Sequence, residues 1–270
     1  MKGRLPWIAP AMVLLLALSI FPLIYSLKLG LKPAHFERMF HDRLFHIALW
    51  QTLLFTALAL IAEFVLGLSL ALLIDGLGRA ARLFRAGLLM PMLLPPVVAA
   101  VAWRLIFNPQ FGVLNGTLKG FGLDTSHLTW TNGEGAALLC VVLVDIWEWT
   151  PFLFLLLSAG LQSLPQEPLE AARVDGASWW QTTRDITLPL LKPVVLLALL
   201  LRSMDLMRIF DQIFILTQGG PGFATETVSL YIYRTAFRFG NFGYAAAMSF
   251  VMLAITTVMA RSLMRVMKTK

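Results

Sequence analysis

The sequence predicts an all-α integral membrane protein in which six transmembrane helices form one domain over residues 1–270. Hydrophobic residues make up 58% of the chain and charged residues only 14%, against about 25% charged residues in soluble domains. The mean hydropathy is +0.76. Several apolar stretches reach roughly 20 residues, the length that crosses a hydrocarbon core of about 30 Å as a helix. A polar loop over residues 162–188 interrupts them, and the chain as a whole belongs in lipid.

The apolar stretches predict six spans, which we take in chain order. They are Leu5 to Leu27, Ile47 to Ile74, about Leu83 to Phe107, Gly135 to Leu161, Pro189 to about Thr217, and Asn241 to Ala260. The first span follows a basic start, Met1-Lys2-Gly3-Arg4, and contains Ala17-Leu18-Ser19, which loosely imitates a signal-peptide cleavage site. Its apolar run is too long for a signal core. We therefore expect it to remain in the protein as the first helix.

The lysines and arginines predict which side of the membrane each loop occupies. With the N-terminus inside, twelve of them, including Lys2, Arg4 and Arg79, fall in inner segments and seven fall in outer segments. Both termini and the 162–188 loop are therefore expected in the cytoplasm. The net charge of +7 is spread over helix ends and not gathered on one face, so we expect no binding of nucleic acid.

Metal, disulfide and nucleotide chemistry find little support in the sequence. Cys140 is the single cysteine and lies in an apolar stretch, where it is expected to act as a packing residue. The four histidines form no His-Glu-x-x-His arrangement, so no metal site is predicted. The sequence contains no Gly-x-x-x-x-Gly-Lys-Ser/Thr segment and no clear inverted duplication. We expect the chain to bind no cofactor, and any ATP to be bound by another subunit.

The polar loop is expected to fold into two short helices. Pro165 and Pro168 stop the preceding span, and Leu169 to about Asp175 form the first helix. Gly176 ends it in the left-handed conformation, and Ser178 caps a second helix that runs toward Ile186. Helices this short are not stable alone in water, so they must pack on a partner. The alternatives are a helix anchored at the membrane surface by its tryptophans, or a connector without a partner.

The residues of this loop resemble the EAA signature of permease subunits of binding-protein-dependent ABC importers. Glu-Ala-Ala, three residues, Gly, nine residues and Ile-x-Leu-Pro all match in position, and the residues concerned are Glu170, Ala171, Ala172, Asp175, Gly176, Ile186, Leu188 and Pro189. The resemblance implies a type I importer fold whose coupling helix sits in a groove of a cytosolic ATPase. It also implies a second permease subunit, two ATPase subunits holding ATP and Mg, an extracytoplasmic solute-binding protein, and the inner membrane of a bacterium or archaeon.

The resemblance extends over nearly the whole chain and points to the carbohydrate branch, the maltose and glycerol-3-phosphate type. It rests on three further segments: Trp103 to Phe107 with Gly112 and Asn115; Leu216 to Gly222; and Thr225-Glu226-Thr227 leading to Tyr231 to Arg234. The chain is similar to the first of two unlike permeases, without the additional N-terminal helices and the large external insert of the maltose permease. The expected solute is a sugar, a polyol or a phosphorylated polyol.

Polar residues within the spans are candidates for the solute path, because ionisable groups in a membrane usually face a cavity or a partner. The candidates are Glu63, Asp145, Trp147, Glu148, Arg202 and Asp205. Arg202, Asp205, Arg208 and Asp211 recur every three residues, which favours pairing along a helix. Two interpretations of this pattern stay open. Either at least one of Arg202 and Asp205 faces the solute, or the residues only pair with one another and have a structural role. Glu63 is expected to pair with Arg104, Arg202 or Arg208.

The outer loop at Gly219, Gly220 and Pro221 is expected to face the binding protein, although an ordinary turn explains the glycines equally well. Two other functions compete with an ATP-driven importer. An integral-membrane enzyme would use Glu63, Asp145 and Glu148 as acid and base. An ion-driven carrier would use the stripe from Arg202 to Asp211 as a relay. Uptake that follows ATP or follows the membrane potential separates the importer from the carrier.

Overall fold

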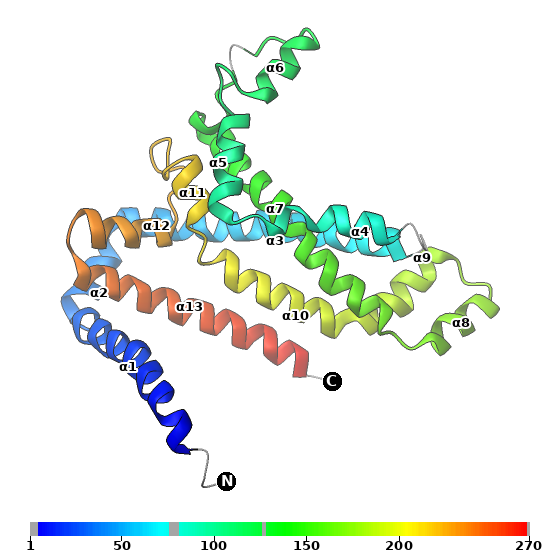
Figure 1. Cartoon of the computed structure of the whole chain (residues 1–270), viewed down its shortest axis with the longest axis horizontal. Coiled ribbons are helices and arrows are strands. Elements are labelled where there is room, and N and C mark those ends of the chain that lie inside the picture. The colour runs from blue at the N-terminus through cyan, green and yellow to red at the C-terminus, as the bar shows by residue number, and fades with distance from the viewer. Residues whose placement is uncertain (1–4, 76–80, 126–127, 269–270) are drawn as a thin grey trace.

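The computed structural model describes residues 5–75, 81–125 and 128–268, and the regular elements in these ranges are all helical. Lys2, Arg4, Arg79, His127 and Lys270 lie outside the described residues. Figure 1 shows an elongated molecule in which the helices over Arg43–Asp75, Leu188–Leu206 and Phe242–Lys268 run roughly along the long axis, whereas those over Leu5–Gly30 and Glu134–Gln162 run obliquely to it. The predicted all-α membrane class is confirmed. Five described helices are long and apolar enough to cross a membrane: Ile8–Gly30, Arg43–Ile74, Gly135–Gln162, Trp179–Leu206 and Phe242–Met267.

The helices follow one another with short connections. In chain order the α-helices are α1 (Leu5–Gly30), α2 (Pro33–His41), α3 (Arg43–Asp75), α4 (Ala81–Leu89), α5 (Pro96–Ile106), α6 (Val113–Gly120), α7 (Glu134–Gln162), α8 (Gln166–Val174), α9 (Trp179–Thr182), α10 (Leu188–Leu206), α11 (Asp211–Leu216), α12 (Val228–Tyr233) and α13 (Phe242–Lys268). The first, second, fourth and sixth predicted spans correspond to α1, α3, α7 and α13, and α13 runs eight residues beyond the predicted end at Ala260.

The third predicted span, Leu83 to Phe107, is not one helix. It is divided into α4, a short 3-10 turn at Pro91–Leu93, and α5. Pro95 and Pro96 explain the division, because a proline disfavours the helical conformation of the residue before it. Leu94 accordingly adopts an extended conformation, with ψ of 137°. The apolar pattern is present, but a span made of one straight helix was the wrong prediction here, and the count of six spanning helices is not reproduced among the described residues.

The fifth span begins earlier and ends earlier than the prediction. The helix is continuous from Trp179 through a π-helical turn at Thr183–Thr187 into α10. Pro189 follows this turn as the second residue of α10, where a missing N–H is tolerated. The helix then stops at Leu206, and α11 is a separate helix packed against α5 and α7. Arg208 and Asp211 therefore do not continue the face of α10, and the predicted four-residue stripe is wrong beyond Asp205.

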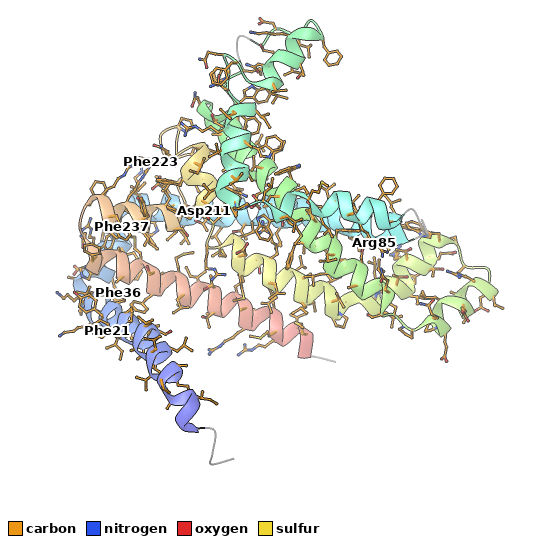
Figure 2. The ribbon with its side chains drawn as sticks, viewed as in Figure 1. Phe21, Phe36, Arg85, Asp211, Phe223 and Phe237 are labelled. Carbon is orange, nitrogen blue, oxygen red and sulfur yellow. The ribbon has the colours of Figure 1, made fainter. Side chains whose placement is uncertain are left out.

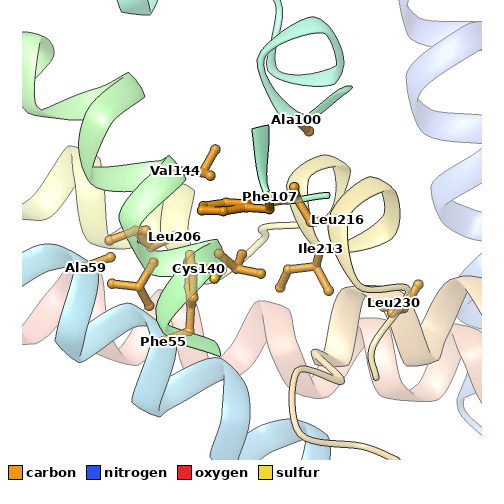
Figure 3. Packing of buried hydrophobic residues seen from close by; sticks show 12 residues of the cluster. Phe55, Ala59, Ala100, Phe107, Cys140, Val144, Leu206, Ile213, Leu216 and Leu230 are labelled. Carbon is orange, nitrogen blue, oxygen red and sulfur yellow. The ribbon is translucent and has the colours of Figure 1, made fainter. Parts of the chain in front are cut away.

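Three buried apolar clusters hold the helices together, and the most extensive packing joins α3 to α7. Figure 3 shows the central cluster, in which Phe55 of α3 and Cys140 of α7 meet Ile213 and Leu216 of α11. The packing role predicted for Cys140 is confirmed. Where α7 meets α10, Gly160 permits close approach, since a Cβ there would lie 2.7 Å from Leu191 Cδ1. These contacts fix the bundle around the polar residues described next.

Candidate coupling loop and polar cavity

The 162–188 loop lies at one end of the long axis, where Figure 1 shows α8 and α9 at the right of the view. Its first helix spans Gln166–Val174, three residues earlier than predicted. Pro165, in an extended conformation, precedes the helix and Pro168 lies in its first turn, where a missing N–H costs no intrahelical bond. The start predicted at Leu169 was therefore late by one turn.

The turn between the two helices forms as predicted. Gly176 has a φ of +75°, and the N–H of Ala177 donates to the carbonyl of Ala172 at 2.9 Å. This bond satisfies one of the free carbonyls at the end of α8. Ser178 then caps α9 in a capping box with Gln181: the backbone N–H of Ser178 donates to Gln181 Oε1 at 2.8 Å. The bend is thus set by the chain itself.

The loop leaves several apolar side chains largely exposed. Val174 is 87% exposed, and Trp179 and Trp180 are 62% and 63% exposed. Ala172 is buried beneath them, whereas Glu170, Ala171 and Asp175 lie on the exposed side of α8. Ile186 and Leu188 are half-buried at the helix that leads into the bundle, and Pro189 is exposed. Exposed apolar side chains of this kind mark a surface that contacts a partner protein or a membrane.

The strongest polar feature of the bundle is centred on Arg202 of α10. Its Nε donates to Glu63 Oε2 at 2.7 Å and its Nη2 donates to Glu63 Oε1 at 2.9 Å. Nη2 also donates to Asp145 Oδ2 at 2.5 Å, and Nη1 donates to Asp205 Oδ2 at 2.7 Å. Glu63 comes from α3 and Asp145 from α7, so one guanidinium joins three helices. The predicted pairing of Glu63 with an arginine is confirmed, and its partner is Arg202.

Burial separates the members of this cluster into two groups. The side chains of Arg202, Glu63 and Asp145 are at most 2% exposed. Asp205 has a side chain that is 51% exposed, although it also contacts Arg202. Buried charges persist only when they are paired and hydrogen-bonded. Arg202, Glu63 and Asp145 therefore form a buried ion cluster that holds three helices together. Asp205 is the acidic member of the cluster that reaches the surface.

A cavity of about 150 Å³ opens beside Asp205, at the bend between α10 and α11. Trp149 lines it from α7, with the Arg202 guanidinium 4.9 Å from its ring centre. Gln212 lines it from α11, and its Nε2 donates to Glu148 Oε2 at 2.7 Å. Asp211, labelled in Figure 2, is exposed at the same bend. Glu148 therefore lies one hydrogen bond behind the cavity wall.

Trp147 lies elsewhere, although it was grouped with these candidates. Its ring packs edge-on against Trp103 at 5.5 Å between ring centres, and it lines a different, apolar depression with Pro91 and Phe154. Two residues along a helix are about 200° apart, so Trp147 and Trp149 point in nearly opposite directions. The sequence interpretation did not select Gln212 or Phe210, which line the cavity, because the bend that brings them there was not predicted.

The loop after α11 is held by a second buried ion pair. Glu226 is fully buried, and its Oε2 accepts from Arg234 Nη1 at 2.6 Å, while Arg234 Nη2 donates to the carbonyl of Gln218. Burial raises the pKa of Glu226 to about 7, although Arg234 and Arg238 act in the opposite direction. Gly219 is buried against this pair, with Gly220 and Pro221 half-buried. The loop is a packed structure and not a loose glycine-rich connection.

Gly219→Ala is expected to destabilise the protein by about 1–3 kcal/mol. Gly219 has a φ of +83°, and a Cβ there would collide with the Glu226 carboxylate and the Leu230 side chain. Thermal unfolding of the purified protein measures the effect. Gly222→Ala is the matched control, because Gly222 also has a positive φ, +59°, but a Cβ there would meet nothing within 4 Å. Equal losses in the two variants would contradict the role assigned to the Glu226 contact.

Asp42 is a further polar centre that the sequence interpretation missed. Its Oδ2 accepts from the hydroxyls of Tyr231 and Tyr244, each at 2.6 Å, and its Oδ1 accepts from the backbone N–H of Leu44 at 2.9 Å. Burial raises the pKa of Asp42, but these hydrogen bonds outweigh it and lower the pKa overall. An aspartate just before a helix is a recognisable N-cap signal. The two tyrosine partners could not be read from the sequence.

The comparisons with known proteins agree with this geometry. Residues 63–267 match the family model described as "Binding-protein-dependent transport system inner membrane component". The chain is 38% identical over 215 residues to the trehalose/maltose transport system permease protein MalF of Thermococcus litoralis, covering 80% of this chain and 72% of that protein. It is 34% identical over 278 residues to the sulfoquinovosyl glycerol transport system permease protein SmoG of Agrobacterium fabrum, covering 97% and 89%.

The fold also matches a solved structure. A chain from the crystal structure of a bacterial alginate ABC transporter in complex with alginate pentasaccharide-bound periplasmic protein aligns with a TM-score of 0.86. The alignment covers 98% of this chain and 94% of that one at 24% sequence identity. The arrangement of helices described above is therefore that of a known importer chain.

Proposed function

The chain belongs to the family of binding-protein-dependent transport system inner membrane components, and we propose that it forms half of the solute path of an ATP-driven sugar importer. It is a permease, and this excludes the membrane enzyme that used Glu63, Asp145 and Glu148 as acid and base. The observation that carries the proposal is the exposed loop with Gly176 at its bend. This loop lies at one end of the molecule, where a partner protein can dock, and it falls within residues 63–267, which match the permease family model.

The solute proposed is a sugar or a related polyol delivered by an extracytoplasmic binding protein. The names of the relatives support this class, since they include trehalose, maltose and sulfoquinovosyl glycerol transport systems. The second permease supplies the other half of the path. Its proposed place is beside the cavity at the α10–α11 bend, which at about 150 Å³ is smaller than the roughly 300–1,000 Å³ that encloses a typical small ligand.

ATP and Mg are proposed to bind to two cytosolic ATPase subunits that dock on the loop. The sequence has no P-loop of its own. The loop residues in question are Glu170, Ala171, Ala172, Asp175, Gly176, Ile186, Leu188 and Pro189. Glu170 and Asp175 offer acidic contacts, whereas Val174 and the two tryptophans offer apolar ones. Both chain termini then lie in the cytoplasm with this loop, and the Gly219 to Pro221 loop lies on the outer side facing the binding protein.

Uptake into proteoliposomes tests the proposal. The permease pair is purified with its ATPase subunits, ATP is enclosed, the binding protein is added outside, and ion gradients are collapsed with ionophores. We expect labelled trehalose or maltose to accumulate only when ATP is present. A carrier that uses the acidic and basic residues of α10 would instead follow the membrane potential or the pH gradient. Accumulation without the ATPase subunits would refute the proposal.

A further inference from the structure

An open groove of about 510 Å³ lies between α1 and α13, near the end of the molecule opposite the 162–188 loop (Figure 1). At its C-terminal end α1 approaches α13 closely, because a Cβ at Gly30 would lie 2.9 Å from the backbone nitrogen of Ala247. Figure 1 shows the two helices diverging from there toward the N-terminus. Both are long and apolar enough to cross a membrane. The groove is therefore the narrow part of a wedge that lies within the bilayer.

The walls of the groove are mainly apolar and suit a narrow, flexible occupant. Tyr25 and Leu29 line it from α1, whereas Ala245, Ala246 and Ser249 line it from α13. The Ser249 hydroxyl donates to the carbonyl of Ala245 in its own helix at 2.9 Å. An empty groove would cost the lining atoms their dispersion contacts. Inside a membrane it is filled either by a lipid chain or by a helix of a partner.

Basic side chains gather at the narrow end of this groove. Residues 28–43 contain two acidic and four basic side chains, the latter being Lys28, Lys32, Arg38 and Arg43. All four are exposed. Among the described residues none of them forms an ion pair with a carboxylate. Both oxygens of Asp42 already accept hydrogen bonds from within the chain. The segment therefore presents uncompensated positive charge.

Three of these residues are tied to the groove itself. Lys28 follows Tyr25 by three residues in α1, so the two side chains are neighbours on the helix surface. Lys32 immediately precedes α2, two residues after the end of α1. The Arg38 guanidinium lies 4.3 Å from the ring centre of Tyr244, the residue before Ala245. In the proposed orientation this end faces outward, where basic residues are the less common choice. Topology therefore does not account for them.

We propose that the α1–α13 groove binds an acyl chain of an anionic phospholipid whose phosphate lies against Lys28 and Lys32. Hydrocarbon chains are as apolar as leucine, so the groove alone does not distinguish one phospholipid from another. The charge does, because a headgroup with a net negative charge is attracted to lysine and arginine at the membrane surface. An apolar helix of a partner would fill the groove but leave the basic side chains without a counter-charge. The site is separate from the solute path and goes beyond the importer function.

Counting bound lipid by native mass spectrometry tests the site. The full chain, with the subunits that copurify with it, is titrated in detergent with phosphatidylglycerol or with phosphatidylcholine. We expect the anionic lipid to bind at least about fivefold more tightly, which corresponds to about 1 kcal/mol. Lys28→Gln and Lys32→Gln should each weaken binding of phosphatidylglycerol about two- to fivefold and leave phosphatidylcholine unchanged. Lys119→Gln is the matched control, because Lys119 is exposed on α6, far from the groove in Figure 1.

Filling the groove tests the position of the acyl chain. Ser249 is exposed in the groove wall, and the ring of Ser249→Phe would occupy the space. Both lipids should then bind about fivefold more weakly. Ser262→Phe is the control, because Ser262 is also exposed on α13 and its hydroxyl makes the same kind of bond, to the carbonyl of Val258 at 2.9 Å.

A thiol cross-link separates a lipid from a partner helix. Ser249→Cys is treated with a bifunctional thiol reagent in the assembled complex, and the wild type, whose single cysteine is the buried Cys140, is the control. We expect no cross-link to the second permease. A cross-link there, equal binding of the two lipids, an unchanged preference in both lysine variants, or unchanged binding in Ser249→Phe overturns the lipid site. None of these results bears on the importer function, which ATP-dependent uptake decides.

Discussion

Arg202→Met is expected to destabilise the protein by about 3–5 kcal/mol, the cost of leaving buried charges without their partner. The arginine accounts for both hydrogen-bonded oxygens of Glu63 and for the short contact to Asp145, and all three side chains are at most 2% exposed. At roughly 2–4 °C per kcal/mol, the melting temperature should fall by about 10 °C. Thermal unfolding of the detergent-solubilised protein measures it.

Two further variants make this experiment specific to the ion cluster. Arg208→Met removes an arginine from the same region, but Arg208 is exposed and, among the described residues, its side chain donates to the backbone carbonyl of Met204 alone, so the expected change is within about 0.5 kcal/mol. In the triple variant Arg202→Met, Glu63→Gln, Asp145→Asn, the buried carboxylates lose their charge. It should recover most of the lost stability. If the single and triple variants melt at the same temperature, loss of packing and not uncompensated charge is the cause.

Most of the long helices could be predicted well from the sequence, because the apolar residues that identify each one are contiguous in the chain. Predominantly apolar runs of more than 20 residues determine α1, α3, α7 and α13, although Glu63 interrupts the second run and Asp145 and Glu148 interrupt the third. No distant contact is needed to find these helices. The loop was predicted for the same reason: a glycine that must take a positive φ and a serine that caps a helix act within a few residues of themselves. Even here the start of α8 was placed one turn too late, since prolines allow a helix to begin at several nearby positions.

The polar cavity was predicted only in part, because its geometry depends on contacts between distant segments. Nothing local marks the end of α10 at Leu206, where the chain bends so that Gln212 reaches Glu148 on α7. The simplest expectation was a regular helix that continues through Asp211. Because α10 in fact ends at Leu206, this expectation placed Arg208 and Asp211 wrongly. The choice of Arg202 as the partner of Glu63, 139 residues away, likewise requires the packing of α3 against α10.

Glu170→Lys is expected to reduce recovery of the ATPase subunits with the permease by about tenfold or more, equivalent to at least about 1.4 kcal/mol of binding. Glu170 is exposed on α8, so the substitution leaves the bundle intact and reverses the charge that the loop presents to its partner. Copurification on a tag carried by this chain gives the recovery, and ATP-dependent uptake should fall with it. Glu37→Lys is the matched control, because Glu37 is exposed on α2, at the opposite end of the molecule in Figure 1.

Gly176 tests the same surface through the backbone instead of through charge. A Cβ at this position would meet nothing within 4 Å, so a substitution acts through its positive φ or through the docked partner. Asparagine tolerates a positive φ, whereas valine in this conformation costs about 1–2 kcal/mol of conformational free energy. Gly176→Asn should therefore retain the ATPase subunits better than Gly176→Val, and Gly176→Trp should lose them because its bulk blocks close approach. Full assembly and full uptake in both Gly176→Trp and Glu170→Lys would show that the ATPase does not dock on this loop.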